Sequence, residues 1–221
     1  MSERFDQLIQ AIVADDAFRV GALLSEEPGM VKKRDPQGRT PILLALYFRK
    51  EAMAHLIRER TPEPDLFEAA ALGEADLVGE LLETTPHGAN AVSPDGFGVL
   101  GLAVYFGRSE AAKLLLESGA HPDTSSANDF KVRPLHSAAA HLDEEKSVDL
   151  LRLLLDWKAD PNVAQAGGWT PLHQAAAHGR ETAVKLLVEH GASLMAKSDD
   201  GRTPLEMARA KGHTELESLL E

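Results

Sequence analysis

The nine histidines are the residues best suited to chemistry, because the sequence contains no cysteine. His136 and His173 each follow a Pro-Leu pair, and His141 and His178 each come five positions later. Imidazole can bind a metal ion or transfer a proton near neutral pH. A metal pair would need both ligands about 2 Å from one ion, which the spacing of His141 and His178 does not favour. We therefore predict no metal site, and surface contacts for His141 and His178.

Other catalytic patterns give no clear signal. The sequence contains no Gly-x-x-x-x-Gly-Lys phosphate loop, no Gly-x-Ser-x-Gly turn and no His-Glu-x-x-His pair. Acidic pairs such as Asp15-Asp16 and Glu144-Glu145 could act as acids or bases, but no partner group is indicated, so we interpret them as solvated turns. The sequence predicts no catalytic residue, no cofactor and no enzymatic activity. A small enzyme that uses the region of His141 and His178 stays as an alternative hypothesis.

The element that carries two of these histidines is predicted over residues 168–179. Thr170 is a suitable N-cap, because its hydroxyl can accept a hydrogen bond from a free helical N–H. Pro171 follows at the first helical position, where its missing N–H is not needed. Leucine and alanine then recur every three or four residues, and Gly179 is suited to end the helix. This stretch predicts a short helix with a thin apolar face.

The same unit recurs along the chain, and Thr170 and Thr203 are 33 positions apart. Five copies keep a Thr-Pro-Leu-His-like register, and they begin at Thr40, Gly98, Arg133, Thr170 and Thr203. Two weaker copies keep only the helical pattern, at residues 8–15 and 66–73. Each copy is followed by a second apolar segment and a loop. A short helix, a tight link, a second helix and a loop at this period closely resemble the ankyrin repeat.

The resemblance covers essentially the whole chain and implies an all-α solenoid of about seven stacked repeats. We predict one domain, residues 1–221, with repeats at about 1–34, 35–61, 62–92, 93–127, 128–164, 165–197 and 198–221. About nine residues are missing between the second and third copies, near residues 58–64. We therefore expect a shortened loop there, with a notch or bend in the array. Between the helices of the fifth repeat, we expect a longer, charged loop at residues 142–146.

The resemblance implies that His136 and His173 form hydrogen bonds with the backbone of a neighbouring loop. In ankyrin-repeat proteins, the ends of the inner helices and the loop tips line a concave groove that contacts partners. Aromatic residues and histidines recur at the matching places of this sequence, and aromatic side chains are enriched at protein interfaces. The resemblance therefore implies a partner-binding role for Tyr47, Phe48, Phe97, Tyr105, Phe106, Phe130, His141, Trp169 and His178. The alternative is that the aromatic residues only pack between repeats.

Composition and charge narrow the function further. Hydrophobic residues make up 43% of the chain but aromatic residues only 5%, which suits thin stacked helices. The net charge is −12, all of it in residues 65–221, because residues 1–64 hold ten basic and ten acidic side chains. Such an acidic chain would repel phosphate backbones. We predict no nucleic-acid partner and a protein partner with a basic surface.

The predicted function is a non-catalytic protein–protein interaction module. The alternative is a regulatory or inhibitory subunit that masks the active site of an enzyme. The first residues lack the pattern of a secretory signal, and no apolar run approaches the roughly 18 residues of a membrane helix. We therefore expect a cytoplasmic monomer that does not bind membranes.

Overall fold

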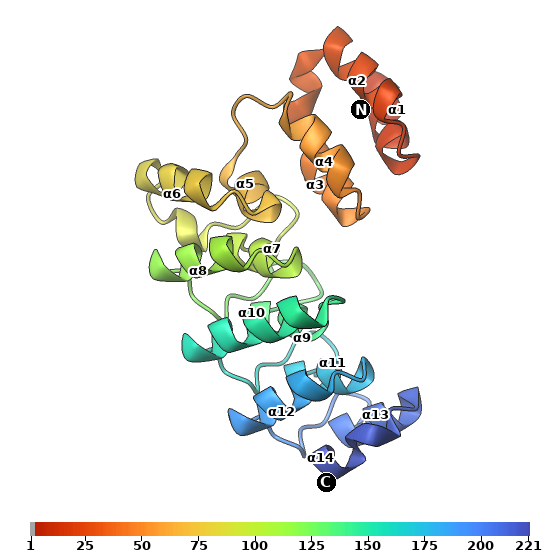
Figure 1. The fold of residues 1–221 in the computed structure, drawn as a ribbon, viewed down its shortest axis with the longest axis vertical. Helices are drawn as coiled ribbons and strands as arrows, with labels where there is room; N and C mark the ends of the chain where they lie inside the picture. The colour runs from red at the N-terminus through yellow and green to blue at the C-terminus, as the bar shows by residue number, and fades with distance from the viewer. Residues whose placement is uncertain (1–2) are drawn as a thin grey trace.

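The computed structural model describes residues 3–221, and the 14 α-helices of this part form two layers (Figure 1). The inner layer consists of α1 (Glu3–Val13), α3 (Pro41–Tyr47), α5 (Leu66–Leu72), α7 (Val99–Tyr105), α9 (Pro134–Ala139), α11 (Pro171–Ala177) and α13 (Pro204–Lys211). The outer layer consists of α2 (Ala17–Glu26), α4 (Glu51–Arg58), α6 (Ala75–Thr84), α8 (Ser109–Glu117), α10 (Glu144–Asp156), α12 (Glu181–Glu189) and α14 (Glu217–Leu220). Three 3-10 turns complete the list: η1 (Pro28–Lys32), η2 (Gly88–Asn90) and η3 (Thr214–Leu216).

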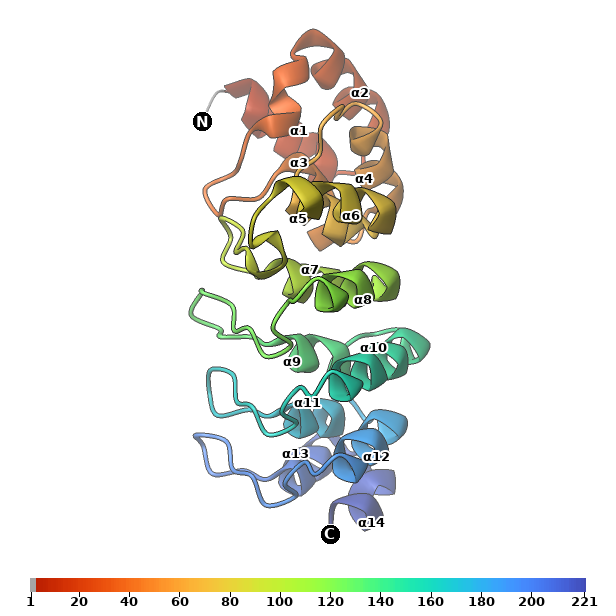
Figure 2. The ribbon, with the colours of Figure 1, turned by 90° about the vertical axis from the view of Figure 1, so that its left-hand side faces the viewer.

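Each inner helix packs against the outer helix that follows it, and the pairs stack into an elongated array. Long loops project from one side of the stack, beside the inner helices (Figure 2). This confirms the predicted helical solenoid. The first predicted repeat starts at residues 1–2, which lie outside the described residues, and the repeat boundaries stay predictions.

The inner helices begin where the cap pattern predicts. Thr40, Thr170 and Thr203 each precede a proline at the first helical position, and each side chain accepts a hydrogen bond from the backbone N–H three residues later. Alanine and leucine fill the inner faces, and Ala175 and Ala176 are fully buried. Small side chains allow neighbouring helices to approach closely, so a continuous core forms with few aromatic residues.

The stack changes at the join between α4 and α5, where the connection is only residues 59–65. The connection from α8 to α9, by comparison, is residues 118–133. Figure 1 shows α4 set apart from α6, whereas α6, α8, α10 and α12 follow one another closely. The buried apolar residues accordingly form two clusters, one built mainly from α1–α4 and one that extends from α5 to α14. The shortened connection and the opening at this join agree with the prediction.

The row of projecting loops nevertheless stays continuous across this join. Gly38, with a φ of 86°, lies so close to the next loop that an added Cβ would be 2.7 Å from the backbone carbon of Pro94. Gly96 and Gly168 approach the following loops, at Asn128 and Asp199, in a similar way. The loop of the second helix pair therefore packs directly on the loop of the fourth (Figure 2). The gap at this join therefore lies between the outer helices α4 and α6.

The expectation of a longer charged loop at residues 142–146 is wrong. The side chain of Asp143 accepts a hydrogen bond from the backbone N–H of Lys146 and begins α10, which is the longest helix of the described chain, with 13 residues. Glu144 and Glu145 lie in its first turn, where negative charges are favoured by the helix dipole. The extra residues therefore lengthen a helix.

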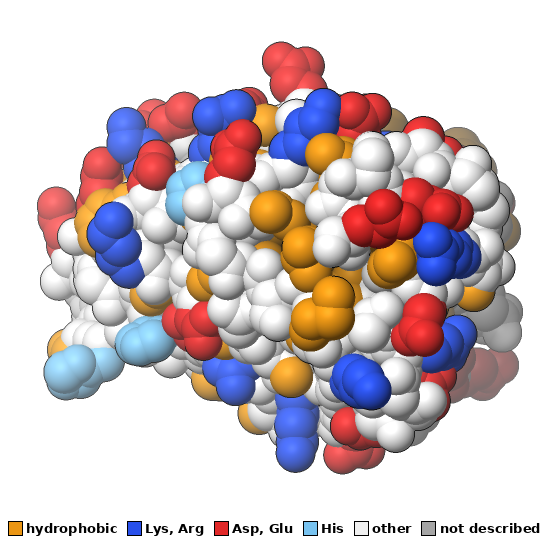
Figure 3. Space-filling model, turned by 90° about the horizontal axis from the view of Figure 1, so that it is seen from below, with side chains coloured by type: hydrophobic (Ala, Val, Ile, Leu, Met, Phe, Trp, Pro, Cys, Tyr) orange, Lys and Arg blue, Asp and Glu red, His pale blue; other side chains and the backbone are white. Residues whose placement is uncertain are grey.

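The lower end of the array, formed by α13 and α14, has a mixed surface. Figure 3 shows hydrophobic side chains near the centre of this face, with acidic and basic groups around them. Arg209 pairs with Glu217 at 2.9 Å and with Glu221 at 3.6 Å. Within residues 3–221, no helix is both long and apolar enough to cross a membrane.

Candidate functional site

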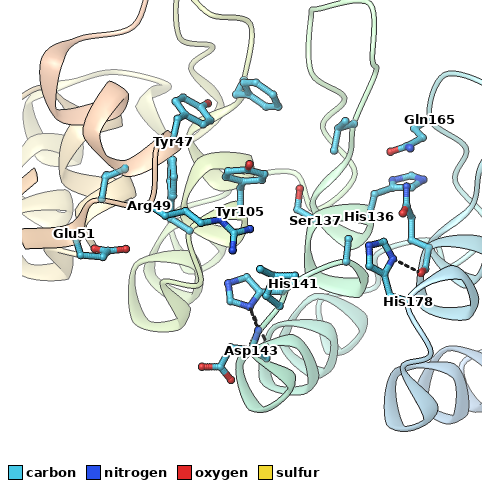
Figure 4. A pocket seen from close by; sticks show the side chains of 17 residues that line it. Tyr47, Arg49, Glu51, Tyr105, His136, Ser137, His141, Asp143, Gln165 and His178 are labelled. Carbon is cyan, nitrogen blue, oxygen red and sulfur yellow. Dashed lines mark hydrogen bonds between the residues drawn. The ribbon is translucent and has the colours of Figure 1, made fainter. Parts of the chain in front are cut away.

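A groove of about 610 Å³ runs along the ends of the inner helices α3, α7, α9 and α11 (Figure 4). We call it the concave groove. Its aromatic lining consists of Tyr47, Phe97, Tyr105 and Phe106. Its charged and polar lining includes Arg49, Glu51, His136, Ser137, His141, Asp143, Gln165, Gln174 and His178. The described residues thus form a hollow that extends over several helix pairs.

The aromatic residues of the concave groove form one cluster at the end of the groove that is lined by α3 and α7. The ring of Tyr47 lies 5.1 Å from that of Phe106, 5.7 Å from that of Tyr105 and 6.4 Å from that of Phe97, between centroids. Tyr105 and Phe106 meet edge to face at 5.0 Å. Phe106 is almost buried, at 9% exposed, while Tyr105 is 45% exposed. Phe106 therefore packs, and Tyr105 offers an accessible aromatic surface.

Tyr47 joins the second and fourth helix pairs across the third. The inner helix of the third pair, α5, ends at Leu72 and is followed by Gly73, whereas the second and fourth pairs have bulky aromatic residues at these places. The third pair also has no long loop before it, so the hydroxyl of Tyr47 reaches the next loop and donates to Asp95 at 3.0 Å. Burial first, and then the carboxylate of Asp95, raise the pKa of Tyr47, which therefore stays protonated. The aromatic cluster is a consequence of the shortened connection.

His141 and His178 both line the concave groove, but each has a separate local role. Nδ1 of His141 accepts from the backbone N–H of Asp143 at 3.2 Å, and Nδ1 of His178 lies 2.9 Å from the carbonyl of Gln174. Burial, and then the charges of Lys146 and Arg49, lower the pKa of His141, against the opposite effect of its contacts with Asp143. No group of three or more metal-binding side chains occurs among residues 3–221. The two rings can offer hydrogen bonds to a partner.

The histidines of the Pro-Leu-His segments bind the next loop, as predicted. Nε2 of His136 lies 2.8 Å from the carbonyl of Trp169, and Nε2 of His173 lies 2.9 Å from the carbonyl of Arg202. Burial is the main cause that lowers the pKa of both, for His136 to about 4. Both are therefore neutral near pH 7, and each can donate through Nε2 to a carbonyl. Their role is to hold successive loops in place.

Three of the predicted residues lie outside the lining of the concave groove. Phe48 is 43% exposed at the end of α3, and Phe130 is 69% exposed at a loop tip. Trp169 is half-buried beside His173, with 6.2 Å between ring centroids. The structure brings six of the nine predicted residues together in the groove. A binding role for all nine stays a prediction.

The charged residues of the groove are absent from the sequence prediction. Arg49 carries a signal that could have identified it, because it occupies the position that Gly107 and Gly179 occupy in other copies. All three have a left-handed backbone, with φ of 58° for Arg49. Such a conformation costs a non-glycine residue about 1–2 kcal/mol. Asp143 and Gln174 carry no comparable signal.

A glycine pattern in the fourth copy also needs a structural explanation. Residues 96–101 match the spacing Gly-x-Gly-x-x-Gly, which binds dinucleotides when it joins a strand to a helix. Here Gly96 lies in a loop tip, Gly98 is the N-cap of α7, and Gly101 lies within that helix. No named strand precedes them in the described chain. The structural context that the dinucleotide motif requires is therefore missing from residues 3–221.

Comparison with protein families identifies a repeat family. The model described as ankyrin repeats in three copies matches residues 66–165 and 135–221, which together cover more than half of the chain. The matched residues include α5 to α14 and most of the lining of the concave groove.

Several curated proteins are similar over most of this chain. A probable 26S proteasome regulatory subunit, p28, of Saccharomyces cerevisiae is 28% identical over 196 residues, which are 82% of this chain and 83% of that protein. The B-cell lymphoma 3 protein homolog of Mus musculus is 30% identical over 86% of this chain. The tyrosine-protein kinase Shark of Drosophila melanogaster is 28% identical over 81% of this chain. The chain spans only 39% of the lymphoma protein and 19% of the kinase.

Proposed function

This chain belongs to the ankyrin-repeat family, and we propose that it binds a partner protein in the concave groove without catalysing a reaction. Ankyrin repeats are protein–protein interaction modules, so the chain acts by binding another protein. The observation that supports the groove as the site is its aromatic cluster, in which Tyr105 is 45% exposed. Large aromatic surfaces beside polar groups are typical of interface residues that contribute most of the binding energy.

We further propose that the partner has a basic surface. The net charge of −12 attracts basic proteins at long range and accelerates their encounter. We also propose that the chain is a monomer with seven repeats in one domain. It has no nucleic-acid partner and is located in the cytoplasm. The lack of cysteine supports the location, because a chain without cysteine needs no oxidising compartment to fold.

The proposal is tested by affinity capture with matched aromatic variants. Tyr105→Ala removes accessible surface inside the concave groove, whereas Phe18→Ala removes an aromatic side chain that is 88% exposed on α2. We expect the captured partner to be lost with Tyr105→Ala and kept with Phe18→Ala, while both variants keep the unfolding temperature. Phe130→Ala, at a loop tip, reports whether the loops also contribute. Equal capture by Tyr105→Ala and the original chain would refute the groove as the site.

A second candidate function is regulation within a larger assembly. The similarity to the p28 regulatory subunit covers about four fifths of both chains, which supports this candidate. In that case the captured partner is an enzyme or part of one. Adding the purified chain to its partner should then change the partner's activity, and Tyr105→Ala should abolish the effect. If the partner's activity stays constant at a saturating concentration of this chain, the regulatory function is refuted and binding alone is the function.

A further inference from the structure

Arg49 has a strained backbone at a position where strain is easily avoided. Gly107 and Gly179 occupy the same place after α7 and α11, with φ of 71° and 66°. The backbone N–H groups of Arg49 and Gly107 make the same turn, to the carbonyls of Leu46 and Val104. Glycine would therefore serve the fold at residue 49. A strained non-glycine residue at a surface site is often retained for what its side chain does.

The side chain of Arg49 lies in the concave groove. Figure 4 shows it extended toward the space between Tyr105 and His141. Lys146 is also close to His141, because a Cβ added at Gly107 would be 2.7 Å from the His141 ring and 2.9 Å from the Lys146 side chain. Three nitrogen-bearing side chains thus gather beside the aromatic cluster. We call this group the basic corner.

The nearby carboxylates have other partners. Glu51 pairs with Arg108 at 2.7 Å, and Asp95 accepts from the hydroxyl of Tyr47 at 3.0 Å. Asp143 accepts from the backbone N–H of Lys146 and begins α10. The guanidinium of Arg49, by contrast, has no ion pair or hydrogen bond within residues 3–221. The basic corner is therefore complementary to an additional negative group.

We propose that the basic corner binds the carboxylate of an Asp or Glu side chain from an extended partner segment, with a neighbouring apolar residue of that segment against Tyr105. This inference rests on the proposed function, because it assigns the chemistry of the segment that enters the concave groove. Guanidinium binds carboxylate through two parallel charge-assisted hydrogen bonds, and such pairs are stronger than neutral ones. His141 and Lys146 offer further donors at the same place.

A basic partner surface and an acidic anchor residue are compatible. Exposed charges interact over about 10 Å at 0.1 M salt, so the potential inside the basic corner depends mainly on its nearest groups. The net charge of −12 affects the approach of a partner, and Arg49 affects which residue of that partner fits.

The test uses random twelve-residue peptides, displayed on phage and selected on the immobilised full chain. We expect the selected peptides to share an Asp or Glu within two residues of an aromatic or aliphatic side chain. Changing that acid to its amide should weaken binding of the synthetic peptide about tenfold. Arg49→Gly should cause a similar loss, and combining both changes should add little, because each removes the same contact.

Matched variants separate binding from stability. Glycine suits the backbone at residue 49, so Arg49→Gly should not lower the unfolding temperature. Lys158→Gly makes the same change at another left-handed position, with φ of 64°, outside the groove lining. We expect Lys158→Gly to leave peptide binding unchanged.

The outcomes distinguish this inference from the proposed function. One outcome is that the selected peptides bind the Tyr105→Ala variant more weakly but contain no preferred acid and bind the Arg49→Gly variant normally. This outcome would overturn the role of the basic corner and support the concave groove as the binding site. Selected peptides that are insensitive to Tyr105→Ala, or no selected peptide at all, would overturn both. A tenfold loss with Lys158→Gly as well would show a general charge effect and overturn the assigned contact.

Discussion

At the scale of single residues, the buried histidines show how one motif depends on its neighbours. The Nδ1 atom of His173 lies 2.8 Å from the Thr170 hydroxyl, so both ring nitrogens have partners. In the helix of His136, the N-cap residue is Arg133, whose side chain makes no capping hydrogen bond. The Nδ1 atom of His136 is therefore buried without a partner. His136 is 1% exposed. Protonation of this ring would place a charge in the core, which is unfavourable.

The first prediction follows from the low pKa of His136. Its pKa is about 4 in the folded chain and 6.5 as the reference value, so the unfolded chain binds the proton first as the pH falls. The contribution of neutral His136 to the stability of the fold is therefore complete above pH 6.5 and is lost as the pH falls toward 4. From pH 7 to pH 5, this one group should reduce the free energy of unfolding by about 2 kcal/mol.

Urea unfolding at both pH values tests this, with His136→Gln as the comparison. Glutamine can donate to the Trp169 carbonyl but does not titrate, so its loss of stability between pH 7 and pH 5 should be smaller by about 2 kcal/mol. Parallel losses in both proteins would contradict the assignment of the effect to His136.

At the scale of elements, successive loops approach one another closely through their backbones, in addition to the hydrogen bonds that His136 and His173 make to them. Gly38 is the sharpest case, because it combines a φ of 86° with contact to Pro94 across the shortened join. The same join leaves α4 apart from α6 and lets Tyr47 reach the fourth pair. The geometry of the loops therefore creates the aromatic end of the concave groove.

Gly38→Ala should destabilise the chain strongly. The new Cβ would lie 2.7 Å from Pro94 backbone in a backbone conformation that alanine disfavours, so we expect a loss of about 2 kcal/mol or more. Gly29→Ala is the control, because no atom lies within 4 Å of its added Cβ, and its effect should stay within about 0.5 kcal/mol. Thermal unfolding of both variants measures the difference, and equal unfolding temperatures would refute the close packing of these loops.

At the scale of the whole molecule, stability depends on contacts between neighbouring helix pairs. Helix α13 packs on α11, and Met207, Ala208, Leu216 and Leu220 are buried at this end. No single pair encloses its own apolar face, so each relies on the next.

Ending the chain after residue 197 should therefore expose the apolar side of α11. We expect a lower unfolding temperature, with aggregation or partial unfolding, measured by calorimetry and size-exclusion chromatography with light scattering. Removal of the exposed Glu221 alone is the control and should have little effect. A shortened chain that stays monodisperse with an unchanged unfolding temperature would contradict stacking by neighbours.

The sequence alone determined the repeating architecture. Threonine and proline at helix starts, and leucine and alanine at helical spacing, act over a few residues, and the recurrence of the unit made the stack predictable. The missing residues near 58–64 predicted the changed join for the same local reason.

Only the tertiary structure decided which residues share the groove. Tyr47 packs against Tyr105 across a helix pair, and Arg49 lies near His141, which belongs to a helix pair distant in sequence. These contacts depend on how the shortened join places the second pair against the fourth. Local patterns report which elements form, whereas contacts between distant residues depend on the angles and distances at which those elements stack.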